Sequence, residues 1–266
     1  MKASISKEDI GYFGFAFYWT WMSVTFFSPT LFGSSPNAGT VAQTAWLWMA
    51  GAASVLRLVH IVSCRLLPAI SDKKFFVGAA FFASTIGAAL LPLGSYMSGF
   101  ALGGLPVLSI TGAILCGMSS CWISIMWGEA YAGKNSEVSF VLISMTFILS
   151  CILHFGIVAL PSPMAIVVTS LLNALSILAV LSMRFTSTSF QVSSLAKPKP
   201  KFSLLIILPL VAVFLYASCG EVLHTFLSLP GGADDLSSMG VWYTGGGGIG
   251  TAILLAVVLV VRRVMG

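Results

Sequence analysis

The residues best suited to chemistry are the few charged and imidazole side chains inside long apolar segments. Arg57 and His60 lie one helical turn apart in one such segment. A cation in hydrocarbon costs about 3 kcal/mol by insertion scales, so it usually pairs with a carboxylate or serves a site. We expect Arg57 to pair with Glu129, which ends another apolar segment. Binding of an anionic ligand by Arg57 is the alternative.

Two further polar positions are candidates for a ligand site or a structural role. Glu221 and His224 are three residues apart and share a helical face, which suits a proton relay or a metal pair. They also lie near the outer end of their segment, where both can be ordinary hydrated residues. Asn173 is near the middle of its segment and should find a partner across a helix interface. We expect His154 to pack and to bond to a neighbouring helix.

Aromatic side chains are concentrated in residues 11–32. Such rings can line a cavity for an aromatic or apolar ligand, and Tyr18, Trp19 and Trp21 are the candidates for that role. The rings cover all faces of a helix, so others must pack or face lipid.

No catalytic constellation accompanies these residues. The sequence offers no Ser-His-Asp arrangement at credible depth, no zinc-ligand spacing and no nucleotide fingerprint. The glycines at 245–248 lack the Lys-Ser/Thr ending of a phosphate loop, so we expect close helix packing or an irregular turn there. We therefore expect no enzyme activity, no catalytic residue, no metal and no cofactor.

The elements that must position the candidate residues are transmembrane helices. Of the 266 residues, 58% are hydrophobic and 8% are charged, whereas an average soluble chain is about 25% charged. We predict an all-α integral membrane protein with eight transmembrane helices in the lipid bilayer. The apolar runs, each near the roughly 20 residues that cross a bilayer, are 11–32, 42–62, 75–97, 105–127, 138–160, 163–183, 202–227 and 244–261.

The basic residues indicate the orientation. Of the 13 Lys and Arg, 12 lie at the termini and in alternate connections, and the other is Arg57. By the positive-inside rule both termini are cytoplasmic, in a multi-pass protein of the cell (inner) membrane. Because these charges sit in short loops beside anionic headgroups, we expect no direct contact with nucleic acid.

A linker divides the chain. Residues 186–201 are rich in Ser and end in Lys-Pro-Lys-Pro-Lys, which predicts a semi-extended cytoplasmic segment. It separates a six-span membrane half, residues 1–185, from residues 202–266, which hold two spans. This layout predicts a partial major-facilitator-like fold, a six-helix half plus the first two helices of an incomplete second half. Uncovered surfaces on such a chain predict a homo-oligomer.

Three stretches resemble the membrane half of a family of bacterial LuxR-type transcriptional regulators. They are residues 14–32 (GFAFYWTWMSVTFFSPTLF), Trp46–Ala50 (WLWMA) and Trp127–Tyr131 (WGEAY). In that family a twelve-span facilitator-like domain precedes a cytoplasmic helix-turn-helix domain. The resemblance, mainly over the first six spans, implies a membrane sensor module that senses a small molecule and regulates transcription. DNA would be reached only through the helix-turn-helix domain, which this sequence lacks, so we expect a fragment of a longer regulator, with a free-standing relative as the alternative.

The alternative is a major-facilitator-type secondary transporter, again partial. Transporters of that class usually carry glycines and an Asp-Arg pair after their second span. Here the loop keeps Asp72 followed by Lys73 and Lys74 but has no glycines, which weakens this assignment. A scaffold without a ligand is the third class.

The orientation can be tested by cysteine accessibility. Cysteines at Ser35 and Ser237 should react with an impermeant thiol reagent in intact cells. Cysteines at Lys134 and Ser193 should react only after permeabilisation, because the basic connections are cytoplasmic. Labelling of the Ser193 position in intact cells would contradict the eight-span arrangement.

Overall fold

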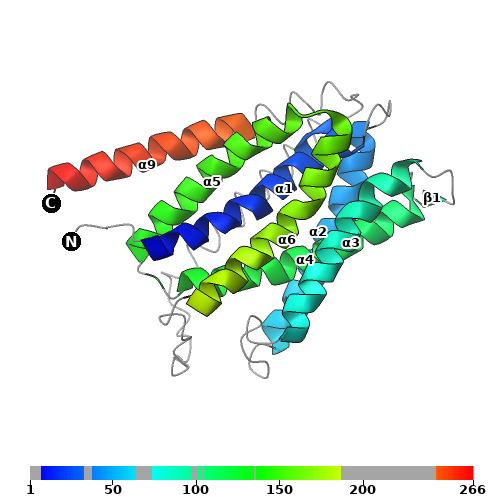
Figure 1. The fold of residues 1–266 in the computed structure, drawn as a ribbon, viewed down its shortest axis with the longest axis horizontal. Coiled ribbons are helices and arrows are strands. Elements are labelled where there is room, and N and C mark those ends of the chain that lie inside the picture. Colours follow the sequence, from blue (N-terminus) through cyan, green and yellow to red (C-terminus); the bar gives the residue numbers. More distant parts are fainter. Residues whose placement is uncertain are drawn as a thin grey trace.

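The computed structural model describes residues 7–32, 38–63, 74–96, 101–102, 105–132, 134, 136–186 and 244–265. These residues are helical apart from a two-residue ladder (Figure 1). The chain is a multi-pass helical membrane protein, since four helices in the described part are long and apolar enough to cross a bilayer. The predicted span 202–227 lies outside the described residues, so the count of eight remains a prediction. The four helices cover Lys74–Gly94, Val107–Ala132, Val138–Val158 and Pro163–Met183.

The first span is not one regular α-helix. It begins with η1 (Lys7–Gly14), a 3-10 helix of eight residues, and continues as α1 (Phe15–Phe27). Extended backbone at Ser28 ends α1, and η2 (Pro29–Leu31) follows. A 3-10 segment this long is uncommon because its hydrogen-bond geometry is poorer than that of an α-helix.

The next helices follow the predicted apolar runs closely. They are α2 (Ala38–Ser63), α3 (Lys74–Tyr96), α4 (Val107–Ala132), α5 (Ser136–Val158) and α6 (Ser162–Thr186). Helix α4 begins later than predicted because β2 (Leu105–Pro106) pairs antiparallel with β1 (Ala101–Leu102). Helix α9 (Gly246–Met265) is the last described element. Hydropathy therefore located these helices, and the β1–β2 pairing set the start of α4.

The helices form two groups around α1 and α4. Helix α1 lies between α5 and α6, while α4 packs against α2 and α3 (Figure 1). Helices α3 and α6 contact each other and join the groups. Helix α9 lies along α5, where Gly245, Gly247 and Gly248 approach Phe155, Phe147 and Cys151. Close packing, one of the two arrangements expected for this glycine run, is thus found at these three glycines, whereas a Cβ at Gly246 would meet nothing within 4 Å.

Small residues allow α3 and α4 to approach each other closely. A Cβ added to Gly112 would lie 2.8 Å from the backbone nitrogen of Leu91 and 2.9 Å from the carbonyl oxygen of Gly87. The Ser109 hydroxyl donates to the Leu91 carbonyl at 3.0 Å. Lipid tails are as apolar as the helix side chains, so the hydrophobic effect does not drive helices together in a bilayer. Close packing and interhelical hydrogen bonds of this kind hold the helices together instead.

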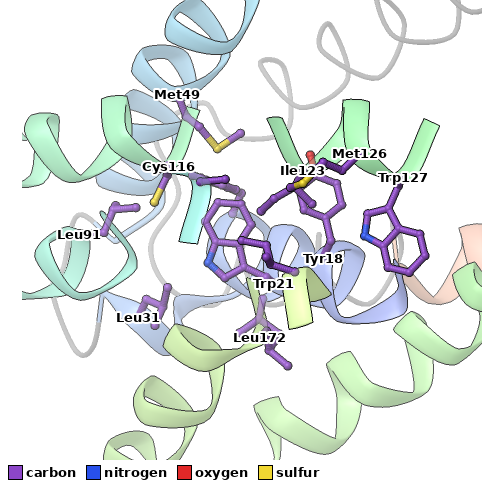
Figure 2. Packing of buried hydrophobic residues seen from close by; sticks show 14 of the residues in the cluster. Tyr18, Trp21, Leu31, Met49, Leu91, Cys116, Ile123, Met126, Trp127 and Leu172 are labelled. Atoms are coloured by element: carbon purple, nitrogen blue, oxygen red, sulfur yellow. The ribbon is translucent and has the colours of Figure 1, made fainter. Parts of the chain in front are cut away.

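The distribution of side chains fits a lipid environment. Large apolar residues such as Leu58, Phe75 and Val167 are exposed on the outside of the bundle. The interior combines aromatic and aliphatic side chains (Figure 2) with many buried Ser and Thr. Their hydroxyls bond mostly to carbonyls three or four residues earlier, as Ser119 does to Cys116 and Thr20 to Ala16. The exposed apolar face is therefore the surface that acyl chains cover.

The close approach of α3 and α4 can be tested with two matched glycines of α4. Gly112→Ala should lower the Tm in detergent, because its new Cβ meets the backbone of α3. Gly128→Ala should leave the Tm unchanged or raise it, because a Cβ there has no heavy atom within 4 Å and alanine favours helices by about 1 kcal/mol over glycine. Equal effects of the two substitutions would contradict this packing.

Candidate functional site

Helix α1 carries a continuous group of aromatic rings into the bundle. Phe15 stacks on Tyr18 with ring centroids 5.7 Å apart and on Trp127 at 5.2 Å. Trp19 meets the edge of Phe147 on α5 at 5.9 Å. These contacts arise because α1 presents a ring at nearly every position to three neighbouring helices. The aromatic group therefore packs α1 against α4 and α5.

Tyr18 connects this aromatic group to a polar strip on α4. Its hydroxyl is 2.6 Å from that of Ser120, and the Ser124 hydroxyl donates to the Ser120 carbonyl at 2.6 Å. The Arg57 guanidinium on α2 is near enough to act electrostatically on the Tyr18 and Cys121 side chains. Arg57 and Tyr18, two residues predicted for the site, are thus within electrostatic range of each other, with Tyr18 buried and Arg57 exposed.

Arg57 itself is exposed, and His60 is partly exposed one turn further along α2. Among the described residues the close ion pair joins Lys134 to Asp9, and none joins Arg57 to Glu129. The predicted Arg57–Glu129 pair is therefore not formed in this structure. The Arg57 side chain is exposed on α2, so its charge is not enclosed in the bundle and does not require a carboxylate partner there.

Four fully buried residues at the contact of α1 with α6 have polar atoms without a partner. They are Trp21 and Thr25 on α1 and Thr169 and Asn173 on α6, each 0% exposed. Within the described part of the chain, the Trp21 Nε1, both hydroxyls and both amide atoms of Asn173 find no hydrogen-bond partner. The bond that we expected for Asn173 across a helix interface is therefore not made by a described side chain. We call these four residues the polar quartet.

The polar quartet is costly if it stays unpartnered. A buried polar atom without a partner costs about 1 to 3 kcal/mol, and the quartet has five such atoms. Their combined cost would rival the roughly 5–15 kcal/mol that separates folded from unfolded protein. The burial of these unpartnered atoms therefore needs an explanation other than side-chain packing.

The neighbouring polar contacts across helices are, by contrast, satisfied. The Trp127 indole N–H donates to the Ser176 hydroxyl at 2.9 Å, from α4 to α6. His154 Nδ1 lies 3.0 Å from the Ser23 hydroxyl, linking α5 to α1. The prediction that His154 packs and bonds to a neighbouring helix is confirmed. The quartet is thus unusual within its own bundle.

Sequence reasoning missed the residues that bind η1 to the loop between α4 and α5. Lys134 Nζ lies 2.9 Å from Asp9 Oδ1 and 5.2 Å from the centre of the Tyr12 ring. The Tyr12 hydroxyl donates to the Ala130 carbonyl at 3.2 Å, and its ring lies 5.1 Å from that of Tyr131. The spacing of Lys134 gives no indication of this pairing, because Asp9 is 125 residues away in the sequence.

The remaining candidates have no structural description. Glu221 and His224 lie outside the described residues, so their proposed relay or metal role stays a prediction. In the part of the chain that the structure describes, no three His, Cys, Asp or Glu residues are grouped as a metal site.

Comparison with known proteins adds no assignment. No protein-family model, no curated protein and no solved structure matches this chain. Functional inference therefore rests on the contacts described above and on the three stretches singled out in the sequence.

The Trp127–Ser176 bond gives a direct test of how polar contacts hold the helices. Ser176→Ala should lower the free energy of unfolding by about 1 to 3 kcal/mol, because it leaves a fully buried indole N–H unpartnered. Ser170→Ala on the same helix is the control, since that hydroxyl bonds to the Ile166 carbonyl within α6. Its effect should stay within about 0.5 kcal/mol. Equal losses in thermal or denaturant unfolding would contradict a special role for Ser176.

Proposed function

We propose that this chain is the membrane part of a small-molecule sensor, similar to the LuxR-type regulators that its sequence resembles, and that it binds an aromatic anion beside Arg57. The observation that carries the proposal is that Arg57 lies within electrostatic range of Tyr18, whose hydroxyl is paired with Ser120 and whose ring packs with those of Phe15 and Trp19. A cation, a hydroxyl pair and ring faces match the carboxylate and ring of such a ligand.

A facilitator-like arrangement of the first six helices is supported by the pattern of helix contacts. Helix α1 packs on α5 and α6, and α4 packs on α2 and α3. If α1, α2 and α3 are exchanged in order with α4, α5 and α6, the contacts of α1 with α5 and α6 become the contacts of α4 with α2 and α3. The α3–α6 contact maps onto itself. Two inverted three-helix repeats produce this exchange, as in each half of facilitator folds.

Signalling toward the cytoplasm is supported by the position of α1. Its α-helical part carries the rings beside the proposed ligand, and its continuation η1 is held to the α4–α5 loop through Asp9 and Lys134. A ligand that moved α1 would therefore act directly on that ion pair. Only a ligand that binds two arrangements with different affinity can drive such a change.

The ligand part of the proposal can be tested by thermal shift of the purified protein with benzoate, against neutral benzyl alcohol. Benzoate should raise the Tm of the unmodified protein, and Arg57→Met should abolish the shift. Arg65→Met, which removes the same charge just beyond α2, should keep it. Tyr18→Phe should weaken binding about fivefold, because one hydrogen bond is worth about 1 kcal/mol. Equal shifts by both compounds, or a full shift in Arg57→Met, would refute an anion site at Arg57.

A facilitator-type transporter remains the second candidate, favoured by the exchange symmetry of the helix contacts. The coding sequence after residue 266 separates the two. A helix-turn-helix domain favours the regulator, whereas four further spans and a stop codon favour the transporter. Uptake of labelled benzoate into proteoliposomes would support transport as well.

A further inference from the structure

The polar quartet lies at one level of the bundle, one helical turn along α1 from Tyr18, and it does not include Arg57. Helices α1 and α6 run antiparallel, because Gly11 meets Met183 while Gly14 meets Ala179. At equal rise along both helices, Trp21 is then level with residues 172–173, and Thr25 with residues 168–169. Trp21 and Leu172 belong to the same group of buried side chains (Figure 2). The unpartnered atoms of α1 therefore occur at the height of those on α6.

The four side chains offer a defined set of hydrogen bonds. The indole N–H of Trp21 can only donate, while the Thr25 and Thr169 hydroxyls and the Asn173 amide can donate and accept. All are fully buried, so neither bulk water nor lipid headgroups reach them. Trp127, equally buried, has its indole satisfied by Ser176. An occupant must supply at least one acceptor, for the indole, and is favoured if it also supplies a donor.

We infer that the seam between α1 and α6 binds a small neutral molecule that both donates and accepts hydrogen bonds, held by Trp21, Thr25, Thr169 and Asn173. The bound molecule should be neutral, because the quartet has no charged side chain to balance the charge of an ion. Two sources share this chemistry, namely an internal water and a small organic amide or alcohol. Buried waters typically make about three hydrogen bonds to otherwise unsatisfied groups, which the quartet can supply.

The first arm of the test uses isosteric substitutions. Thr25→Val/Thr169→Val removes two hydroxyls without changing side-chain shape. With an occupant present, the double variant should lower the Tm by about 4 °C or more, since it breaks real hydrogen bonds. In a dry seam it should hold or raise the Tm, because deleting unpartnered groups costs nothing. Thr20→Val is the control, since its hydroxyl bonds to the Ala16 and Ser150 carbonyls and its loss must lower the Tm in either case.

The second arm identifies the occupant by NMR of protein in which the seven tryptophans carry 15N-labelled indoles. The Trp21 signal is the one lost in Trp21→Phe. It should show a nuclear Overhauser cross peak to water, and the Trp127 indole should not. On addition of acetamide, a cross peak to its methyl group that replaces the water peak assigns an organic ligand, and a persistent water peak assigns an internal water.

Two results would overturn the inference. One is a Trp21 indole with no cross peak to water or to acetamide. The other is a Thr25→Val/Thr169→Val variant whose Tm equals or exceeds that of the unmodified protein. Both readouts are independent of Arg57, so they stand whether or not benzoate binds there.

Discussion

A polar group inside a membrane protein must find its partner within the protein, and this constraint organises the bundle. Hydroxyls of Ser and Thr use the carbonyls of their own helices, which lets small polar residues line the interior at little cost. Contacts between helices are fewer and more informative. Trp127 with Ser176, Tyr18 with Ser120 and His154 with Ser23 each fix the height of one helix against another. They set the register that nonspecific apolar packing leaves open.

The same constraint explains why two places in the bundle stand out. The exposed Arg57 acts electrostatically on the buried Tyr18 and forms no close ion pair with Glu129. At the contact of α1 and α6, five polar atoms are buried without a partner. Natural sequences tend to break local rules where function compensates for the cost. Both places involve α1, whose aromatic sequence already suggested a ligand site.

Hydropathy predicted most of the described fold, because a bilayer demands about 20 apolar residues per crossing and little else competes with that signal. It located α2 to α6 and placed α9 within a few residues. It could not foresee the 3-10 helix η1, which depends on the approach of Gly11 and Gly14 to α6. The Asp9–Lys134 ion pair could not be predicted either, because a single sequence does not show which connecting segments lie close together in the fold. The sequence correctly predicted that Asn173 is a polar group in need of a partner. Its neighbours could not be predicted, because they depend on the register of α6 against α1.

The first span is the element through which these features can influence one another. Its α-helical part contacts α5 and α6, carries the rings beside Arg57 and contributes Trp21 and Thr25 to the polar quartet. Its 3-10 part is fastened to the α4–α5 loop by Asp9, Tyr12 and Lys134. A 3-10 segment at the end of an α-helix can convert to α geometry by exchanging hydrogen bonds, shortening by about 0.5 Å per residue. Over the eight residues of η1 that is a shift of about 4 Å, enough to break a hydrogen bond or an ion pair at one end when the other end is held.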